Sequence, residues 1–114
     1  MVGTEFGGDS RLRRPDEFSA VLARRRPVRS AHFEVHYVPN GRASARLGLI
    51  VGRKADKRAV VRNLSKRIAR EAFRAIWGRL PALDVVVRAS RPLRGTARRE
   101  LRAEIDALLG PLAR

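Results

Sequence analysis

The segment from Val60 to Trp77 places the strongest constraint on the fold, because its apolar residues recur at helical spacing. With Arg62 set to zero and about 100° per residue, an arc from roughly 200° to 320° is apolar. The members of this arc are Val61, Leu64, Ile68, Ala72, Ala75 and Ile76. Gly78 and Pro81 end the helical pattern. A helix with one apolar arc must bury that arc, so we expect this segment to pack on a β-sheet.

The other side of this helix is polar and basic. Arg62, Lys66 and Arg70 fall at about 0°, 40° and 80°, and Asn63, Arg74 and Arg67 follow near 100°, 120° and 140°. These six residues are called the basic ridge. The preceding basic loop extends it with Arg53, Lys54, Lys57 and Arg58. Like charges at this spacing repel by about 0.2–0.5 kcal/mol per exposed pair, which is consistent with a polyanionic partner that neutralises them.

The charge of the whole chain supports the same interpretation. Its 26 Lys and Arg outnumber the 11 Asp and Glu and give a formal net charge of +15. From Arg53 to Arg74, nine Lys or Arg face only Asp56 and Glu71, so a merely solvated charged surface is the weaker alternative. Nucleic acid is the first candidate partner, although basic residues alone do not separate RNA from DNA.

The remaining segments predict two more helices and three strands. They are a helix over Asp16–Arg25 after Pro15, strands over Ala31–Val38, Arg46–Gly52 and Leu83–Ala89, and a helix from an N-cap at Thr96 to Leu109. We expect the first two strands to form an antiparallel hairpin, and the segment from Arg46 to Ala89 is long enough for a parallel strand–helix–strand crossover. Residues 11–114 therefore predict one domain with a small mixed sheet, preceded by a Gly-rich disordered tail over residues 1–10.

Alternation within the strands predicts which side chains are buried. Phe33, Val35 and Tyr37 are expected to face the core, with His32, Glu34 and His36 on the other side. The unbroken run from Val85 to Val87 is typical of a central or covered strand. Tyr37 and Trp77 are therefore expected to be packing residues.

Several classes of protein are excluded by the sequence. The chain has no cysteine, which excludes disulfides, thiolate metal sites and a Cys nucleophile. Its longest apolar runs fall far short of the roughly 20 residues of a membrane span, and residues 1–10 carry no signal-peptide pattern. The default compartment is the cytosol.

No convincing protein active site for phosphodiester cleavage is evident. Asp16 and Glu17 are adjacent on a helix and point apart, and Glu100 and Glu104 lie among arginines in a pattern typical of salt bridges. His32 and His36 share a strand face without a third ligand, so RNA contact or solvent exposure is expected rather than a metal site. Asp56 or His36 is a weak candidate contributor to a cation held by phosphates.

The residues of the basic helix resemble a known family. The run RNLSKRIAREAFR at residues 62–74 is similar to the RNR motif of the bacterial ribonuclease P protein component. The runs LGLIVGRK (47–54), LDVVV (83–87) and PDEF (15–18), together with Phe33, resemble the flanking strands and the first helix of that family. The resemblance covers about Arg11 to Leu109.

This resemblance implies a fold and a function. The fold is a two-layer α/β (α+β) sandwich with a small mixed sheet, in the order α-β-β-(β)-α-β-α. It is similar to a domain of a ribosomal protein and has a left-handed βαβ crossover. The implied partners are the ribonuclease P catalytic RNA and precursor tRNA, with no membrane and no DNA, and with one monomeric protein per ribonucleoprotein. The holoenzyme removes the 5′ leader of precursor tRNA, and Mg²⁺, bound mainly by the RNA, serves the RNA-catalysed hydrolysis.

The resemblance also assigns residues. It places the basic ridge and basic loop against RNA, and it matches Phe18, Leu22, Phe33 and His36 with a cleft for the single-stranded leader. Phe33 is matched with either a cleft aromatic or a core aromatic. Leu22 and His36 stand where many members carry aromatic residues, and Asp56-Lys57-Arg58 replaces a Gly-containing loop. Phe18 is either a stacking surface or plain core. A structural RNA-binding protein of ribosomal type remains the alternative function.

Overall fold

The computed structural model describes residues 10–23 and 27–113. Its elements are α1 (Pro15–Leu22), β1 (Val28–Arg29), β2 (Phe33–Pro39), β3 (Arg46–Ile50), α2 (Ala59–Ile76), β4 (Leu83–Ala89) and α3 (Arg98–Leu109), with short 3₁₀ turns after α2 and α3. This order agrees with the α-β-β-(β)-α-β-α order that the resemblance implied, and the short strand β1 was not among the three strands predicted from the residues. The expected tail over residues 1–9 and the end of the first helix at Arg24 and Arg25 lie outside the described residues. Ser10 is buried, so the tail prediction is wrong at that residue.

The sheet is mixed, and its strand order is β1-β2-β4-β3. β3 and β4 are parallel, as the predicted crossover requires, while β2 and β4 are antiparallel. The predicted hairpin is wrong, because β4 lies between β2 and β3. The physical reason is that Val85, Val86 and Val87 are fully buried and apolar on both faces, so β4 takes the central position that the sequence pattern indicated. The left-handed sense of the crossover stays a prediction.

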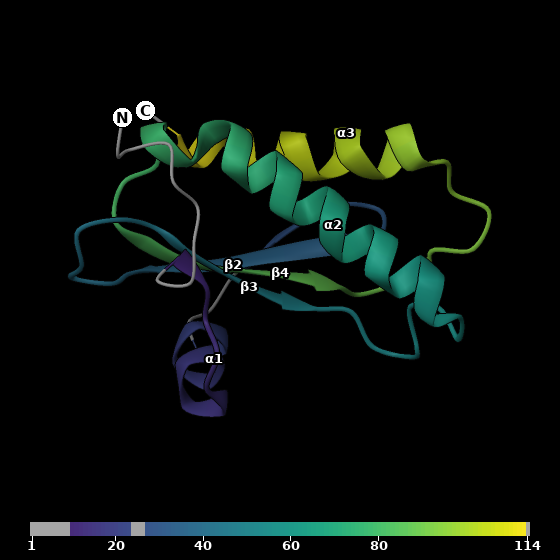
Figure 1. The fold of residues 1–114 in the computed structure, drawn as a ribbon, viewed down its shortest axis with the longest axis horizontal. Helices are drawn as coiled ribbons and strands as arrows, with labels where there is room; N and C mark the ends of the chain where they lie inside the picture. Colours follow the sequence, from purple (N-terminus) through teal and green to yellow (C-terminus); the bar gives the residue numbers. More distant parts are fainter. Residues whose placement is uncertain (1–9, 24–26, 114) are drawn as a thin grey trace.

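Two unequal cores lie on the two faces of the sheet. α2 and α3 cover one face and α1 covers part of the other (Figure 1). The main core contains Phe33, Phe73 and Ile105, all at most 1 % exposed. The second core joins Val21 of α1 to Val86 of β4, with Leu12 from the segment before α1. The second core therefore fixes α1 against the sheet.

Burial along β2 differs from the predicted alternation. Glu34 and His36 are each 8 % exposed and are bonded to each other on the face of the sheet that α1 partly covers, whereas Tyr37, on the opposite face, is 41 % exposed. The prediction that Tyr37 is core is therefore wrong. Trp77 is a packing residue as expected: its ring lies against the main core, and its Nε1 donates to the Ala45 carbonyl at 2.9 Å.

The start of α3 departs from the expectation, whereas its end at Leu109 is as predicted. Ala97, rather than Thr96, is the N-cap, and its N–H donates to the carboxylate of Glu100 at 3.0 Å. The first-turn glutamate thus satisfies the N–H of the cap residue, while the Thr96 hydroxyl lies 3.1 Å from His32 Nε2 and does not cap the helix. In the described parts of the chain, no helix is both long and apolar enough to cross a membrane.

Candidate nucleic-acid interface

The buried side of α2 is rotated relative to the predicted apolar arc. Phe73 is completely buried although it falls on the basic side of the helical projection, and Ala75 is exposed although it falls on the apolar side. The ring of Phe73 packs in the main core. Because it buries much more apolar area than the methyl group of Ala75, its burial determines the rotation of α2. The basic ridge is therefore not opposite the core but begins at its border.

This rotation divides the ridge into two rows. Arg62, Lys66 and Arg70 are half-buried beside the sheet, whereas Asn63, Arg67 and Arg74 are exposed. Among the described residues, Lys66, Arg67 and Arg70 form no salt bridge with a carboxylate. Lys66 and Arg70 of the inner row line a hollow, and the outer row faces solvent.

The hollow beside the inner row lies between α1, β3 and α2. It has a volume of about 180 Å³, and its apolar lining comes from Leu12, Phe18, Leu47 and Leu49. Arg11, Lys66 and Arg70 supply its cationic lining. An aromatic and aliphatic surface next to cations suits a nucleotide, whose base stacks while its phosphate is neutralised. We call this hollow the β3-edge pocket.

Like charges are crowded at the β3-edge pocket. Burial, followed by the neighbouring guanidinium groups of Arg11, Arg67 and Arg74, lowers the pKa of Arg70 below its usual range. An arginine stays protonated in a protein, so this shift reports an unfavourable charge environment rather than a neutral side chain. An anion placed in the pocket would relieve that repulsion.

Only one of the four residues matched with the leader cleft lines this pocket. Phe18 does so, whereas Leu22 is half-buried and packs against the second core. Phe33 is 1 % exposed in the main core, on the other face of the sheet from Phe18. His36 is buried, with its Nε2 2.8 Å from Glu34 Oε1 and its Nδ1 without a partner.

The sequence interpretation missed most of the pocket. Arg11 and Leu12 lie there because the Leu12 N–H donates to the Leu47 carbonyl at 2.9 Å, which adds the N-terminal segment to the edge of β3. Arg11 and Leu12 directly follow a Gly-rich stretch and show no helical or strand periodicity, so the sequence pattern did not predict their place in the pocket. Leu47 and Leu49 were recognised as strand residues, but their place at the sheet edge depended on the strand order.

A buried ion-pair network holds α1 in position beside the pocket. Arg46 Nε and Nη2 donate to the two carboxylate oxygens of Asp84 at 2.8 and 2.7 Å, and Nη1 donates to Glu17 at 3.0 Å. Glu17 also accepts from the N–H groups of Arg13 and Arg14, and these bonds are the main reason that its pKa is lowered to about 2. The network ties α1 to β3 and β4.

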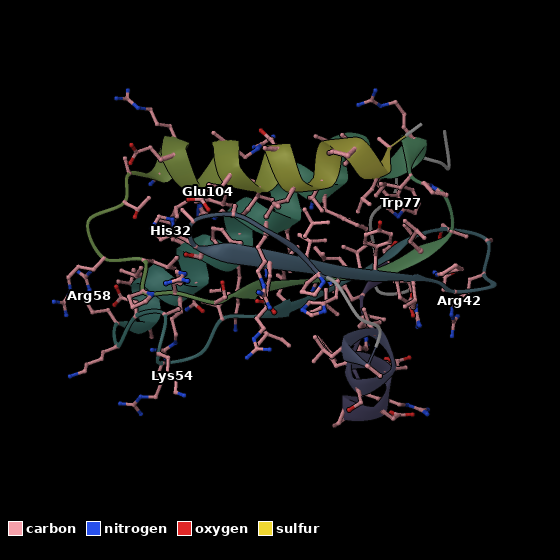
Figure 2. The ribbon with its side chains drawn as sticks, turned by 180° about the vertical axis from the view of Figure 1, so that it is seen from behind. His32, Arg42, Lys54, Arg58, Trp77 and Glu104 are labelled. Atoms are coloured by element: carbon pink, nitrogen blue, oxygen red, sulfur yellow. The ribbon has the colours of Figure 1, made fainter. Side chains whose placement is uncertain are left out.

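The basic loop lines a second, wider hollow at the start of α2. Arg53, Lys54, Lys57 and Arg58 surround it together with Arg94 from the loop between β4 and α3. Lys54 and Arg58 extend from the same end of the molecule, away from α1 (Figure 2). The Asp56 carboxylate is bonded to Arg58, whose hydrogen bonds lower the pKa of Asp56. Arg94 was not predicted, since it is distant in sequence from the other four cations.

Each of the two histidines is hydrogen-bonded to a carboxylate of the protein, His32 to Glu104 and His36 to Glu34. His32 Nδ1 is bonded to the Glu104 carboxylate (Figure 2), and its Nε2 lies 3.1 Å from Thr96 Oγ1. Solvent exposure is therefore wrong for His36, which is 8 % exposed, while His32 is half-buried. RNA contact at either histidine stays a prediction. Within residues 10–23 and 27–113, His, Asp and Glu side chains do not gather in threes that would hold a metal ion.

Comparison with known proteins places this geometry in a family. Residues 6–113 match the family described as ribonuclease P. The chain is 48% identical to the ribonuclease P protein component of Azoarcus sp. (strain BH72) over 107 residues, covering 94% of this chain and 89% of that protein. It is 44% identical to the ribonuclease P protein component of Chromobacterium violaceum over 114 residues, covering 100% of this chain and 94% of that protein.

Solved structures agree with the sequence comparison. The RNase P protein of Staphylococcus aureus superposes with a TM-score of 0.80 at 25% identity, covering 90% of this chain and 94% of that one. The RNase P protein of Thermotoga maritima gives a TM-score of 0.74 at 30% identity, covering 90% and 97%. With its RNR helix, its mixed sheet and this match over nearly its whole length, the chain belongs to the ribonuclease P protein component family.

Proposed function

We propose that this protein is the RNA-binding subunit of a cytoplasmic ribonuclease P, in which one protein binds the catalytic RNA and the 5′ leader of precursor tRNA. The observation that carries the proposal is the continuity of cationic surface along α2. The basic loop lies at the start of the helix, the exposed row of the ridge along it, and the β3-edge pocket beside it. Membership of the family supports the same assignment.

The two rows of the ridge suit two kinds of RNA contact. The exposed guanidinium of Arg67 is placed for bidentate bonds with phosphate oxygens of a folded RNA. Lys66 and Arg70 instead border a surface that includes Phe18. A leader base stacked on Phe18 would gain about 1–3 kcal/mol, with its phosphate next to these cations.

We assign the chemistry to the RNA. The reaction hydrolyses one phosphodiester bond and leaves a mature 5′ end on the tRNA. The described side chains do not fit a protein-held Mg²⁺ site, since Asp56 is bonded to Arg58 and His36 to Glu34. No step is therefore assigned to a metal on the protein. In this proposal the protein holds the leader and screens phosphate charge while RNA phosphates bind Mg²⁺.

A precursor-tRNA cleavage assay tests the function. The protein is mixed with a bacterial ribonuclease P RNA and precursor tRNA at low Mg²⁺ concentration, and the 5′ product is measured. We expect no cleavage by the protein alone and strong stimulation when protein and RNA are combined. Binding to the RNA without stimulation would instead support a structural RNA-binding protein of ribosomal type.

A further inference from the structure

Arg62, the first residue of the RNR run, is engaged within the protein. Its Nη1 donates to the carbonyl of Asp56 at 3.0 Å and to the carbonyl of Lys57 at 2.8 Å. Both carbonyls belong to the loop that leads into α2, and the side chain of Arg62 is half-buried beside them. One guanidinium nitrogen thus closes the loop onto the first turns of the helix.

The same loop is attached at two further points. The Ala55 carbonyl accepts from the Leu93 N–H at 2.9 Å, and both residues are at most 4 % exposed. The Asp56 carboxylate accepts from the backbone N–H of Arg58 at 2.8 Å and from its Nε at 3.1 Å. These bonds fix the loop to the segment between β4 and α3 and set its last turn before α2.

The consequence of this attachment is an assembled cluster of cations. Arg53, Lys54, Lys57, Arg58 and Arg94 surround one open hollow of about 1080 Å³. The only carboxylate in its lining, Asp56, is occupied by Arg58. Five like charges around one hollow repel one another, so a loop released from its attachments would spread them apart. The hollow is wider than a single phosphate needs and suits a stretch of RNA backbone.

Arg62 differs from the other ridge residues in this respect. Arg67 is exposed and forms no salt bridge within the described part of the chain, so its removal deletes one cation and leaves the loop as it was. Removal of the Arg62 guanidinium also deletes the two bonds that hold the carbonyls of Asp56 and Lys57. The two arginines, five residues apart on one helix, form a matched pair for an experiment.

We propose that Arg62 is a positioning residue that holds the basic loop in the arrangement in which five cations meet the RNA together. The inference rests on the proposed function, because it names how that RNA-binding surface is built. In this arrangement the entropy of ordering the loop is lost during folding rather than during association, which strengthens binding without a new contact.

The first test is amide hydrogen exchange in the protein without RNA. Arg62→Met keeps the apolar stem of the side chain and removes its guanidinium, and Arg67→Met is the control. We expect at least tenfold faster exchange at the amides of Arg58 and Leu93 in Arg62→Met only. The amide of Val86 in the central strand should be unchanged and reports global stability. Wild-type protection of the Arg58 and Leu93 amides in Arg62→Met would overturn the proposal.

The second test is a double-mutant cycle on binding to a bacterial ribonuclease P RNA. Lys57→Ala is made in the wild type, in Arg62→Met and in Arg67→Met, and Kd is measured across a salt series. The salt slope should fall by about 0.7–0.9 for Arg67→Met, as expected for one phosphate contact, and by at least twice that for Arg62→Met. The Lys57→Ala loss should be at least threefold smaller in Arg62→Met than in Arg67→Met.

The outcomes separate the two proposals. Additive losses in both cycles, with wild-type protection of the loop amides, would refute the positioning role and leave the RNA-binding function intact. If the wild-type protein does not bind this RNA, the proposed function fails, while the exchange experiment still decides whether Arg62 holds the loop.

Discussion

The ring of Phe18 lies directly over the backbone of Gly48. A Cβ added to Gly48 would be 2.6 Å from Phe18 Cε1 and 2.9 Å from Cζ, which is closer than carbon atoms can approach. Leu12 Cδ1 would also be only 3.0 Å away. The missing side chain in the middle of β3 thus makes the room in which Phe18 lines the β3-edge pocket.

Gly48→Ala should displace Phe18 and lower stability. Overpacking a filled site costs about 1–3 kcal/mol, and the ring or the whole of α1 must move. We expect a lower denaturant midpoint, together with a weaker preference for precursor over mature tRNA. Gly52→Ala is the control, because a Cβ there has no atom within 4 Å. Wild-type stability and substrate preference in Gly48→Ala would contradict the packing account.

Phe18→Ala should reduce binding of precursor tRNA more than binding of mature tRNA. A lost base–aromatic stack is worth about 1–3 kcal/mol, which is a loss of roughly 5- to 150-fold in affinity. Both Kd values are measured with the ribonuclease P RNA present. Tyr37→Leu removes an exposed aromatic ring outside the pocket and should leave the preference unchanged. Equal losses for the two tRNAs after Phe18→Ala would mean that Phe18 only packs.

The basic helix could be predicted from the sequence because its information is local. Helical periodicity located the cationic side, and the unbroken valines from Val85 to Val87 identified β4 as covered on both faces. The rotation of α2 could not be predicted in this way. The helical projection counted Ala75 as an apolar position equal to the larger residues. In the structure, the large ring of Phe73 determines which side of α2 is buried.

The pairing of the strands depends on contacts that no local pattern contains. The turn after Pro39 suggested a hairpin, but β4 inserts between β2 and β3 and moves β3 to the sheet edge. The position of β3 at the sheet edge determines which of its residues border α1, and therefore which residues line the β3-edge pocket. Phe33 and His36 were matched with a leader cleft through the resemblance, and the strand faces place Phe33 in the main core and His36 against Glu34.

Arg46→Met should destabilise the protein strongly. It removes three hydrogen bonds from a side chain that is 10 % exposed and leaves the carboxylate of Asp84, also 10 % exposed, without its cation. Breaking a buried pair from one side costs about 3–5 kcal/mol. Chemical denaturation measures the loss, and adding Asp84→Leu should recover part of it. Arg102→Met, which breaks an exposed pair with Asp106, should cost about 0.5 kcal/mol or less.

The stability of the protein should fall steeply in acid, and Glu17 should account for part of the slope. Its pKa is lowered from 4.5 to about 2, mainly because the N–H groups of Arg14 and Arg13 donate to it. A carboxyl group with a lower pKa in the folded state contributes stability above its unfolded pKa and loses it as the pH falls through the folded value. The contribution of Glu17 should therefore be complete above about pH 4.5 and disappear towards about pH 2.

Glu17→Gln tests this dependence while leaving an oxygen that accepts the same backbone N–H groups. Melting temperatures are measured between pH 7 and pH 2 for the wild type, Glu17→Gln and Asp16→Asn, which controls for the change in net charge on the same turn. Residue 17 takes up no proton in Glu17→Gln, so this variant should melt lower than the wild type near neutral pH and converge with it in acid. The pKa of Glu34 is also lowered, by its bond to His36, and that of Glu104 by its bonds to Ser30 and His32. The melting temperature of Glu17→Gln should therefore still fall with pH, but less than that of the wild type. A constant difference from the wild type at every pH would show that Glu17 acts by packing and not by its charge.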